Sequence, residues 1–152
     1  SILICPEALP YENSKMFSFA IESAKILKNY NFIFRPHPFF PGKSISNLSN
    51  LEVSNKTIDE DLERSTTLIY RGSYICFDAL SAGLIPIYLS NKNELSIDPL
   101  YKVQFDSLKI QDPHELAKLL SNYKNLLKLK NKLIKKGRNY FYKPNLNSLV
   151  TN

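Results

Sequence analysis

The sequence predicts an α/β fold, a doubly wound parallel sheet flanked by helices. Short apolar segments rich in β-branched and aromatic residues alternate with segments whose apolar residues recur at helical spacing. Alternation of this kind is typical of βαβ units, in which successive strands run parallel. The 152 residues suit one domain, which we place at residues 1–143 with a loose tail over 144–152.

The first third of the chain supplies three of the expected strands. Ile2–Cys5 is an apolar run that predicts a short buried strand. The loop Pro6–Asn13 then leads into a helix over Ser14–Lys28, whose apolar residues fall on one face. Asn31–Phe34 predicts the second strand and Leu51–Val53 a weaker third one.

The middle of the chain continues the alternation. Thr57 is followed three residues later by Glu60, the capping-box pattern that starts a short acidic helix. Thr66–Tyr70 is rich in β-branched residues and predicts a strand. Ser73–Gly83 predicts a helix that begins at the serine and stops at the glycine.

The last third predicts one clear strand and two helices. Leu84–Leu89 is the strand, and Pro86 indicates an edge or strand-start position because proline cannot donate to a ladder. A short extended piece is expected near Leu108. Asp112–Glu115 opens a helix, with Asp112 as its cap, Pro113 at the first helical position and Glu115 closing a capping box. We place the basic C-terminal helices within residues 112–142 and expect the last of them to end near Gly137.

The positive charge is concentrated in the last third. Residues 1–100 carry nine Lys and Arg against eleven Asp and Glu, whereas residues 101–152 carry eleven against three. Between Lys124 and Lys143 there is no acidic residue; the basic residues include Lys128, Lys130, Lys132, Lys135, Lys136 and Arg138. This pattern predicts a solvated helix face or, alternatively, peripheral contact with anionic lipid headgroups or a polyanionic acceptor. No nucleic-acid partner is expected, because no recognition motif accompanies the charge.

Apolar runs, the two cysteines and the first residues of the sequence predict the cellular compartment and whether the chain is part of a longer protein. No apolar run approaches the about 20 residues that span a bilayer, and no signal peptide pattern is present. Cys5 and Cys76 lie in apolar segments, which suggests buried free thiols in a reducing compartment. We therefore expect a cytoplasmic protein, peripheral at the inner membrane face if the basic helices bind lipid. The chain starts directly on a strand without an initiator Met, and we expect a fragment of a longer protein.

The loop after the second expected strand carries the sequence Arg35-Pro36-His37-Pro38. Ligands of open α/β sheets bind at the carboxyl ends of strands. The two prolines restrict the backbone around a fixed cation and an imidazole, which suits the binding of an anion such as phosphate. The alternative is a rigid strand exit with a surface arginine and a solvated histidine.

A second loop, Arg71-Gly72-Ser73, joins an expected strand to an expected helix. Gly72 permits close approach of the backbone, Ser73 stands at the expected helix N-terminus, and Arg71 adds a planar cation. Alternatively, the serine only caps its helix and the arginine is solvated. Two cation-bearing strand exits on one sheet edge favour a phosphorylated ligand.

Other classes of site find less support. The glycine patterns of P-loops and dinucleotide folds are missing, and two distant histidines without a Cys/His cluster predict neither a metal nor another cofactor. On the first loop, the carboxylates of Glu7 and Glu12 could meet a sugar or ribose hydroxyl, although ordinary loop carboxylates are as good an interpretation.

The order of these motifs resembles the C-terminal, nucleotide-binding half of GT-B glycosyltransferases, specifically bacterial enzymes of surface and capsular polysaccharide synthesis. The sialyltransferase-like, Kdo-transferase-like and glycerophosphotransferase-like members share a His-Pro motif and a later serine motif. These motifs correspond here to His37-Pro38 and Ser73, and the stretch Ile58–Leu89 carries most of the match.

The resemblance implies a Rossmann-like domain that binds a nucleotide-activated sugar, with a CMP- or CDP-linked donor as the first choice. It implies that His37 and Ser73 contact the donor phosphate with Arg35 and Arg71 nearby, and that His37 stabilises the leaving nucleotide. Several relatives have paired serines where Tyr74 follows the serine here, which puts the phosphate geometry in doubt. The lipid-linked or polysaccharide acceptor would bind an N-terminal half that we expect to be missing, so this chain alone would bind donor without turnover.

Two other functions remain open from the sequence. The chain could be a non-enzymatic module that docks on an anionic membrane or a partner through its basic helices. It could also be half of a nucleotide-sugar epimerase of similar fold.

Overall fold

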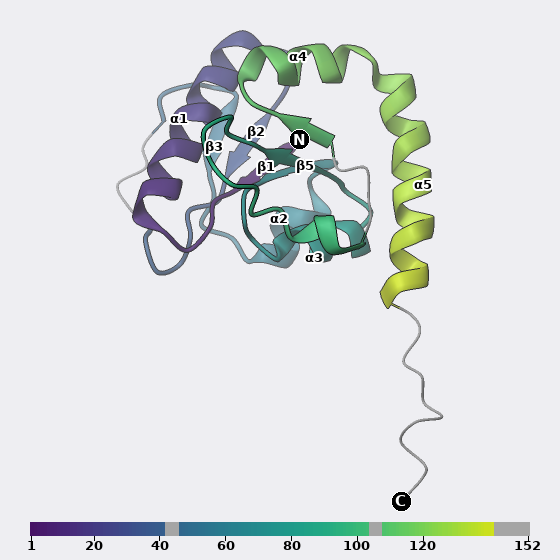
Figure 1. Ribbon diagram of the computed structural model, residues 1–152. Coiled ribbons are helices and arrows are strands. Elements are labelled where there is room, and N and C mark those ends of the chain that lie inside the picture. The colour runs from purple at the N-terminus through teal and green to yellow at the C-terminus, as the bar shows by residue number, and fades with distance from the viewer. Residues whose placement is uncertain (42–45, 104–107, 142–152) are drawn as a thin grey trace, which may run out of the picture.

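A computed structural model describes residues 1–41, 46–103 and 108–141. Within this part of the chain, six strands form one sheet in the order β3-β2-β1-β4-β5-β6, and every pairing is parallel (Figure 1). The strands are β1 (Ile2–Cys5), β2 (Phe32–Phe34), β3 (Leu51–Val53), β4 (Thr67–Tyr70), β5 (Ile85–Leu89) and β6 (Leu108–Ile110). The predicted doubly wound parallel sheet is confirmed.

The helices cover both faces of the sheet and one of its edges. They are α1 (Pro10–Ile26), α2 (Ile58–Glu63), α3 (Ile75–Ser81), the 3-10 helix η1 (Pro99–Val103), α4 (Pro113–Ser121) and α5 (Tyr123–Phe141). Helices α1 and α4 pack on one face, and α2, α3 and η1 pack on the other. Helix α5 stands at the side of the domain, where Leu126 joins the first core cluster and Leu133 the second (Figure 1).

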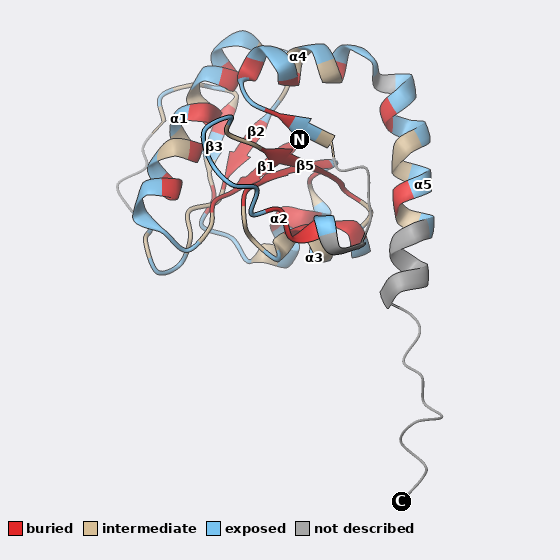
Figure 2. Cartoon of the chain, viewed as in Figure 1, coloured by how far each residue is buried: buried red, intermediate tan, exposed pale blue. Residues whose placement is uncertain are grey.

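Strand β1 shows why these residues form a central strand. Ile2 and Ile4 point toward the core that α1 and α4 close, whereas Leu3 and Cys5 point toward the core under α3. All four residues are buried, as are all residues of its neighbours β2 and β4 (Figure 2). A strand covered on both faces must be apolar throughout, and each such side chain contributes about 1.5–3 kcal/mol by burial.

Two helix starts differ from the prediction. Helix α1 begins at Pro10 rather than Ser14, because proline lacks an N–H and suits the first helical position. The loop after β1 is therefore shorter than expected, and Glu12 lies in the helix and not in the loop. Helix α3 begins at Ile75 with Tyr74 at its N-cap, so Ser73 precedes the helix instead of capping it.

Two further boundaries concern proline and glycine. Pro86 is the second residue of β5 and pairs only with Leu68 of β4, because β6 first pairs at Ile87. Strand β5 is internal, yet its proline occupies a strand-start position where one side carries no ladder. Helix α5 runs through Gly137 rather than ending there, since a single glycine costs a helix interior only about 1 kcal/mol.

The capping boxes expected at two helix starts are borne out in part. At α2, Thr57 and Glu60 form both reciprocal hydrogen bonds. At α4, Asp112 accepts from the second and third helical amides, but Glu115 accepts from the amide of Gln111 instead of closing the box.

The tail over 144–152 lies outside the described residues. None of the described helices combines the length and apolar character needed to cross a membrane.

Candidate functional site

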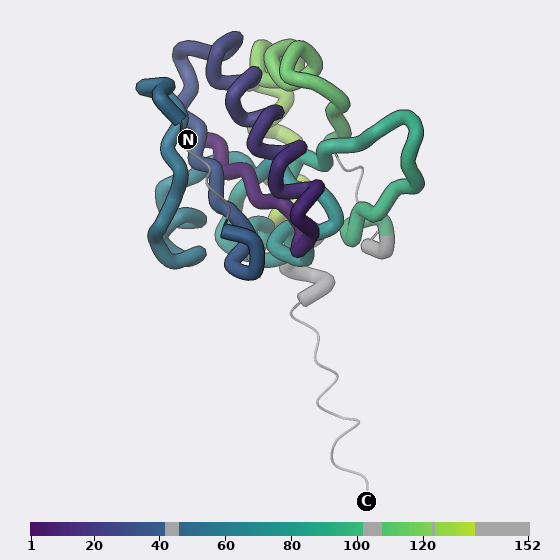
Figure 3. Tube along the Cα trace, turned by 90° about the vertical axis from the view of Figure 1, so that its left-hand side faces the viewer, coloured from purple at the N-terminus to yellow at the C-terminus, as the bar shows by residue number. Residues whose placement is uncertain are grey.

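The strand order creates a switch point between β1 and β4. From this point the chain winds outward through β2 and β3 on one side, and through β5 and β6 on the other. In such sheets a crevice opens at the carboxyl ends of the two central strands, where ligands bind. The loop after β2 and the start of α1 lie together at the lower end of the molecule in Figure 3. The loops that the sequence singled out therefore share one edge.

A pocket of about 260 Å³ lies at this edge. It brings together three of the residues predicted to bind phosphate: Arg35, His37 and Ser73. Its other walls come from the end of β1, the prolines after β2 and the starts of α2 and α3: Cys5, Pro6, Pro36, Pro38, Ile58 and Ile75. The pocket combines apolar walls with one cation, one imidazole and one hydroxyl, and none of the described residues that line it carries a carboxylate.

The Arg35 guanidinium is held from one side. Its NH1 donates to the Lys56 carbonyl oxygen at 2.5 Å and to Asp61 Oδ2 at 2.9 Å. The side chain keeps 21% of its surface exposed, whereas the Asp61 side chain is completely buried. The arginine thus connects the loop after β2 to α2 and still faces the pocket.

Asp61 is the centre of a charged cluster beneath the loop. Its carboxylate accepts from Ser54 Oγ at 2.7–2.8 Å and from Arg64 at 2.7 and 3.1 Å. Arg64 in turn pairs with Glu52 through two bonds of 2.6 and 2.7 Å. Burial alone would raise the pKa of Asp61, but hydrogen bonds from Arg64, Ser54 and Arg35 outweigh it and hold the pKa below its ordinary value. The carboxylate stays charged in the folded protein.

His37 is fixed through its backbone and its ring. Its amide donates to Asn13 Oδ1 of α1 at 3.3 Å, and its Nδ1 accepts from the Phe39 amide at 3.3 Å. An Nδ1 that accepts a hydrogen bond carries no proton, so the neutral ring has its proton on Nε2. In this arrangement the Nε2–H of the imidazole is available as a hydrogen-bond donor.

Gly72 brings the loops after β1 and β4 into close contact. Its φ is +66°, and a Cβ at this position would overlap Glu7 Oε2 and lie 2.8 Å from Ile97 Cδ1. Glycine is required here both by the backbone conformation and by the approach of Glu7. Glu7 is half-buried beside the pocket rather than among its lining residues, and Ser73 Oγ accepts from the Ile75 amide at 3.4 Å.

Arg71 lies elsewhere. Its side chain is only 2% exposed, with Nε 2.8 Å from Glu12 Oε2 of α1 and NH2 against the carboxylate of Glu94. Its NH1 donates to the carbonyl oxygen of Leu89 at 3.2 Å. The structure therefore does not bring Arg71 to the pocket with Arg35. Arg71 is not solvated; it is an internal cation between two carboxylates.

The loop after β5 is fixed at several points behind this edge. Glu94 also pairs with Lys15 at 3.1 Å, and the buried Asp98 accepts from Tyr70 Oη at 2.6 Å. Tyr88 Oη accepts from the Ile97 amide at 3.1 Å. Large apolar side chains are nevertheless exposed around this edge, from the loops after β1, β2, β4 and β5: Leu9, Phe39, Tyr74, Leu95 and Ile97.

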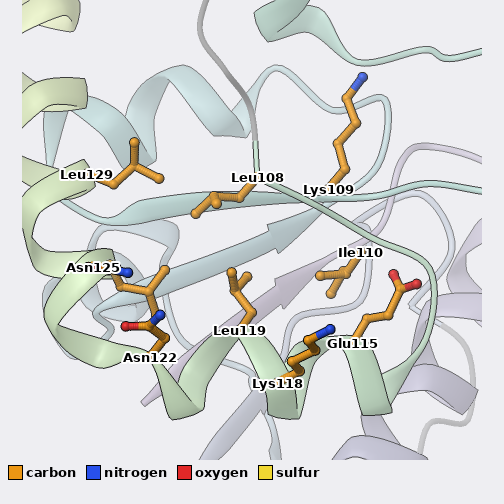
Figure 4. A pocket seen from close by; sticks show the side chains of 10 residues that line it. Leu108, Lys109, Ile110, Glu115, Lys118, Leu119, Asn122, Asn125 and Leu129 are labelled. Atoms are coloured by element: carbon orange, nitrogen blue, oxygen red, sulfur yellow. The ribbon is translucent and has the colours of Figure 1, made fainter.

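A larger hollow, about 560 Å³, lies away from these loops, between β6, α4 and α5. Figure 4 shows Leu108, Leu119 and Leu129 around it, with Asn122 and Asn125 at the turn between the helices. It contains none of the predicted site residues. Its apolar side chains continue the stripes with which α4 and α5 pack, so we assign no site there.

Helix α5 separates its leucines from its lysines. Leu126 and Leu133 are buried, whereas Lys124, Lys128, Lys132 and Lys135 are exposed at spacings of four, four and three residues. Such spacings place the lysines on one face of the helix. The side chains of Lys136 and Arg138 lie outside the described part of the chain. In that part, no group of three or more His, Cys, Asp and Glu residues could hold a metal ion.

Sequence reasoning missed the residues that hold the site in place. The sequence places Asn13 in a loop, but Asn13 is a helical residue and accepts from the His37 amide. Asp61 belongs to the short acidic helix that the sequence predicts, yet it binds Arg35. The sequence offers one indication: Asp61 is an acidic residue one turn after Thr57, at a position that the helix buries.

Solved structures of two other proteins share this fold. The crystal structure of the glycotransferase of kitacinnamycin has a TM-score of 0.62 at 13% sequence identity, over 91% of this chain and 39% of that chain. The glycosyltransferase SnogD from Streptomyces nogalater has a TM-score of 0.65 at 13% identity, over 90% of this chain and 38% of that chain. No family model and no curated protein matches the sequence. The chain thus has a Rossmann-like fold also found in glycosyltransferases, and it spans less than half the length of the two structures.

Proposed function

We propose that this chain is the donor-binding domain of a glycosyltransferase and that its pocket holds the phosphate of a nucleotide-activated sugar. The observation that carries the proposal is the meeting of Arg35, His37 and Ser73 in one pocket near the switch point. A fixed cation, an imidazole N–H and a hydroxyl suit phosphate oxygens. The fold shared with two glycosyltransferases supports this assignment.

The size of the pocket fits one part of such a donor. Ligand pockets usually measure about 300–1,000 Å³, and this one has about 260 Å³. It would therefore enclose the phosphate and a portion of the nucleotide, leaving the sugar outside near Glu7. The exposed apolar residues around this edge support a second surface, from an acceptor-binding part of the protein, that closes over the donor.

The chemistry proposed for His37 follows from its ring. When the bond between the anomeric carbon and the phosphate oxygen breaks, negative charge grows on the departing nucleotide. An Nε2–H already held in place by the Phe39 contact can donate to that oxygen, and Arg35 adds positive charge nearby. A cytidine donor, CMP- or CDP-linked, remains the first choice from the sequence resemblance, with a surface polysaccharide or its lipid-linked precursor as acceptor.

Calorimetry with CMP, CDP, UDP and GDP tests the assignment. We expect the wild type to bind at least one of them, and His37→Ala to weaken that binding about tenfold, the usual effect of losing a hydrogen bond to a charged group. His114→Ala is the matched control, because His114 is exposed at the start of α4 and does not line the pocket. Absence of binding by all four nucleotides, or full affinity in His37→Ala, would refute the phosphate site.

We propose as a second candidate that α5 docks the protein on an anionic membrane. The specific observation is the row of four exposed lysines on a helix without acidic residues. A cluster of this kind near a surface gains about 1 kcal/mol per lysine from anionic lipid. This role is compatible with the first, because a lipid-linked acceptor would lie at the same membrane.

Flotation with vesicles separates this candidate from a solvated helix face. We expect binding to phosphatidylglycerol vesicles but not to phosphatidylcholine vesicles, and loss of binding in Lys132→Glu/Lys135→Glu. The double variant Lys25→Glu/Lys28→Glu changes the net charge equally at exposed positions at the end of α1, and should still float. Flotation that survives reversal on α5 would exclude this surface.

A further inference from the structure

Arg35 has two edges that differ in their surroundings. Its NH1 is occupied by the Lys56 carbonyl and by Asp61. For Nε and NH2, the structure shows no hydrogen-bond acceptor among the described residues. Because the side chain lines the pocket, this second edge is the part of the guanidinium that a ligand can reach. Two parallel N–H groups along one edge match two oxygens of a phosphate.

Asp61 can hold Arg35 in this orientation because Asp61 itself cannot move. Its side chain is completely buried, and both of its oxygens accept from Ser54 Oγ. Arg64 binds it from the other side and is itself held by Glu52. Among the described residues, Asp61 is the carboxylate that contacts Arg35, and it does so through NH1 alone.

We propose that Asp61 is a positioning residue of the phosphate site, which fixes Arg35 through NH1 so that its Nε and NH2 edge faces the donor phosphate. The inference rests on the proposed function and adds a residue that does not touch the ligand. A guanidinium already fixed in the bound orientation loses little rotational freedom when phosphate arrives. Without Asp61, the arginine would adopt several orientations, and binding of phosphate would have to select one.

The test compares ligands that differ only in phosphate. The ratio of the cytidine Kd to the CDP Kd, and of uridine to UDP, is measured by NMR titration on the full chain. We expect Asp61→Asn to lower this ratio about tenfold or more, which is the scale of one charge-assisted contact. Arg35→Ala should lower it at least as far. In Arg35→Ala/Asp61→Asn the second change should add nothing, because Asp61 acts only through Arg35.

Two further variants separate positioning from damage to the fold. Asp59→Asn removes the same charge from an exposed position of α2 outside this cluster, and it should leave the ratio unchanged. Ser54→Ala keeps every charge but removes the hydroxyl that orients Asp61, and it should lower the ratio severalfold. This variant provides the test if Asp61→Asn does not fold.

The outcomes distinguish this inference from the function on which it rests. A wild type that binds none of CMP, CDP, UDP and GDP better than the corresponding nucleoside refutes the phosphate site and the inference together. A normal ratio in Asp61→Asn beside a reduced one in Arg35→Ala refutes the inference alone. Losses that add in the double variant also refute it, because they would show an effect of Asp61 that bypasses Arg35.

Discussion

The loops after β2 and β4 each begin with an arginine, yet the two arginines are used in opposite ways. Arg35 directly follows β2, keeps 21% of its side chain exposed and lines the pocket. Arg71 directly follows β4, is 2% exposed and lies between the carboxylates of Glu12 and Glu94. The difference comes from where the carboxylates lie, because each arginine is preceded by a buried strand and followed by a proline or glycine.

The carboxylate of Asp61 reaches Arg35 from beneath, on α2, and occupies one edge of the guanidinium. Arg71 is met from two sides, by α1 and by the loop after β5, while the carbonyl oxygen of Leu89 takes its NH1. One arginine thus lines a pocket, and the other is enclosed by groups of the protein itself. A cation at a strand exit indicates a binding site only when its partners leave an edge open.

The largest expected effect is on stability, at Arg71. Arg71→Met keeps most of the side-chain volume but leaves buried Glu12 without its cation, which should lower the free energy of unfolding by about 3–5 kcal/mol. Arg35→Met should cost less, about 1.5–3 kcal/mol, because Asp61 keeps Arg64 and Ser54. Urea denaturation of both variants measures the difference.

Removing the charge from both members of the pair is the control for Arg71. Arg71→Met/Glu12→Gln leaves no buried charge at this point and should recover part of the loss. Equal destabilisation by the two single methionine variants would contradict the distinction between the arginines.

The second effect concerns the glycine beside Arg71. Gly72 and Gly83 both have positive φ, +66° and +81°, so alanine should cost about 1–2 kcal/mol at either position. A Cβ at Gly72 also meets Glu7 and Ile97, whereas the nearest atom at Gly83 is 3.8 Å away. Gly72→Ala should therefore lower the urea midpoint more than Gly83→Ala. Adding Glu7→Ala should narrow this gap, and an unchanged gap would mean that Glu7 does not crowd the position.

How much the sequence could predict follows the same division between local and distant contacts. The strands β1 and β3 were predicted to the residue, since a buried strand is a local apolar run. The meeting of Arg35, His37 and Ser73 was also predictable, because the carboxyl ends of parallel strands share an edge whatever the side chains do.

The role of Arg71 could not be predicted, because it depends on residues far away in the chain. Glu94 reaches it only because the loop after β5 turns back over the sheet, where Asp98 accepts from Tyr70. Glu12 reaches it only because α1 starts four residues earlier than its apolar periodicity indicated, at Pro10. The residues next to Arg71 in the sequence therefore predict neither contact.

The third effect is an acid response on the Arg35 side. Because the pKa of Asp61 is lowered in the folded protein, its charge stabilises the fold above the ordinary aspartate pKa of about 3.9. This contribution is lost as the pH falls through the lower, folded-state pKa. Wild type should exceed Asp61→Asn in urea midpoint by the same amount at pH 7 and pH 5, and the gap should narrow below about pH 4. A gap that persists unchanged at pH 3 would show that the charge of Asp61 is not what stabilises the cluster.

The smallest effect concerns local opening of the two regions, measured as the labelling rate of one thiol in each. Cys5 lies in the pocket wall and Cys76 lies in α3, and burial raises the pKa of both thiols to about 12. Only the thiolate reacts, so neither residue should be labelled at pH 8 until the structure opens. In Cys76→Ser and Cys5→Ser, each with one thiol left, labelling should proceed at the rate of global unfolding. Faster labelling of Cys5 than of Cys76 would mean that the pocket wall opens locally without global unfolding. The Asp61 cluster would then hold Arg35 less firmly than Glu12 and Glu94 hold Arg71.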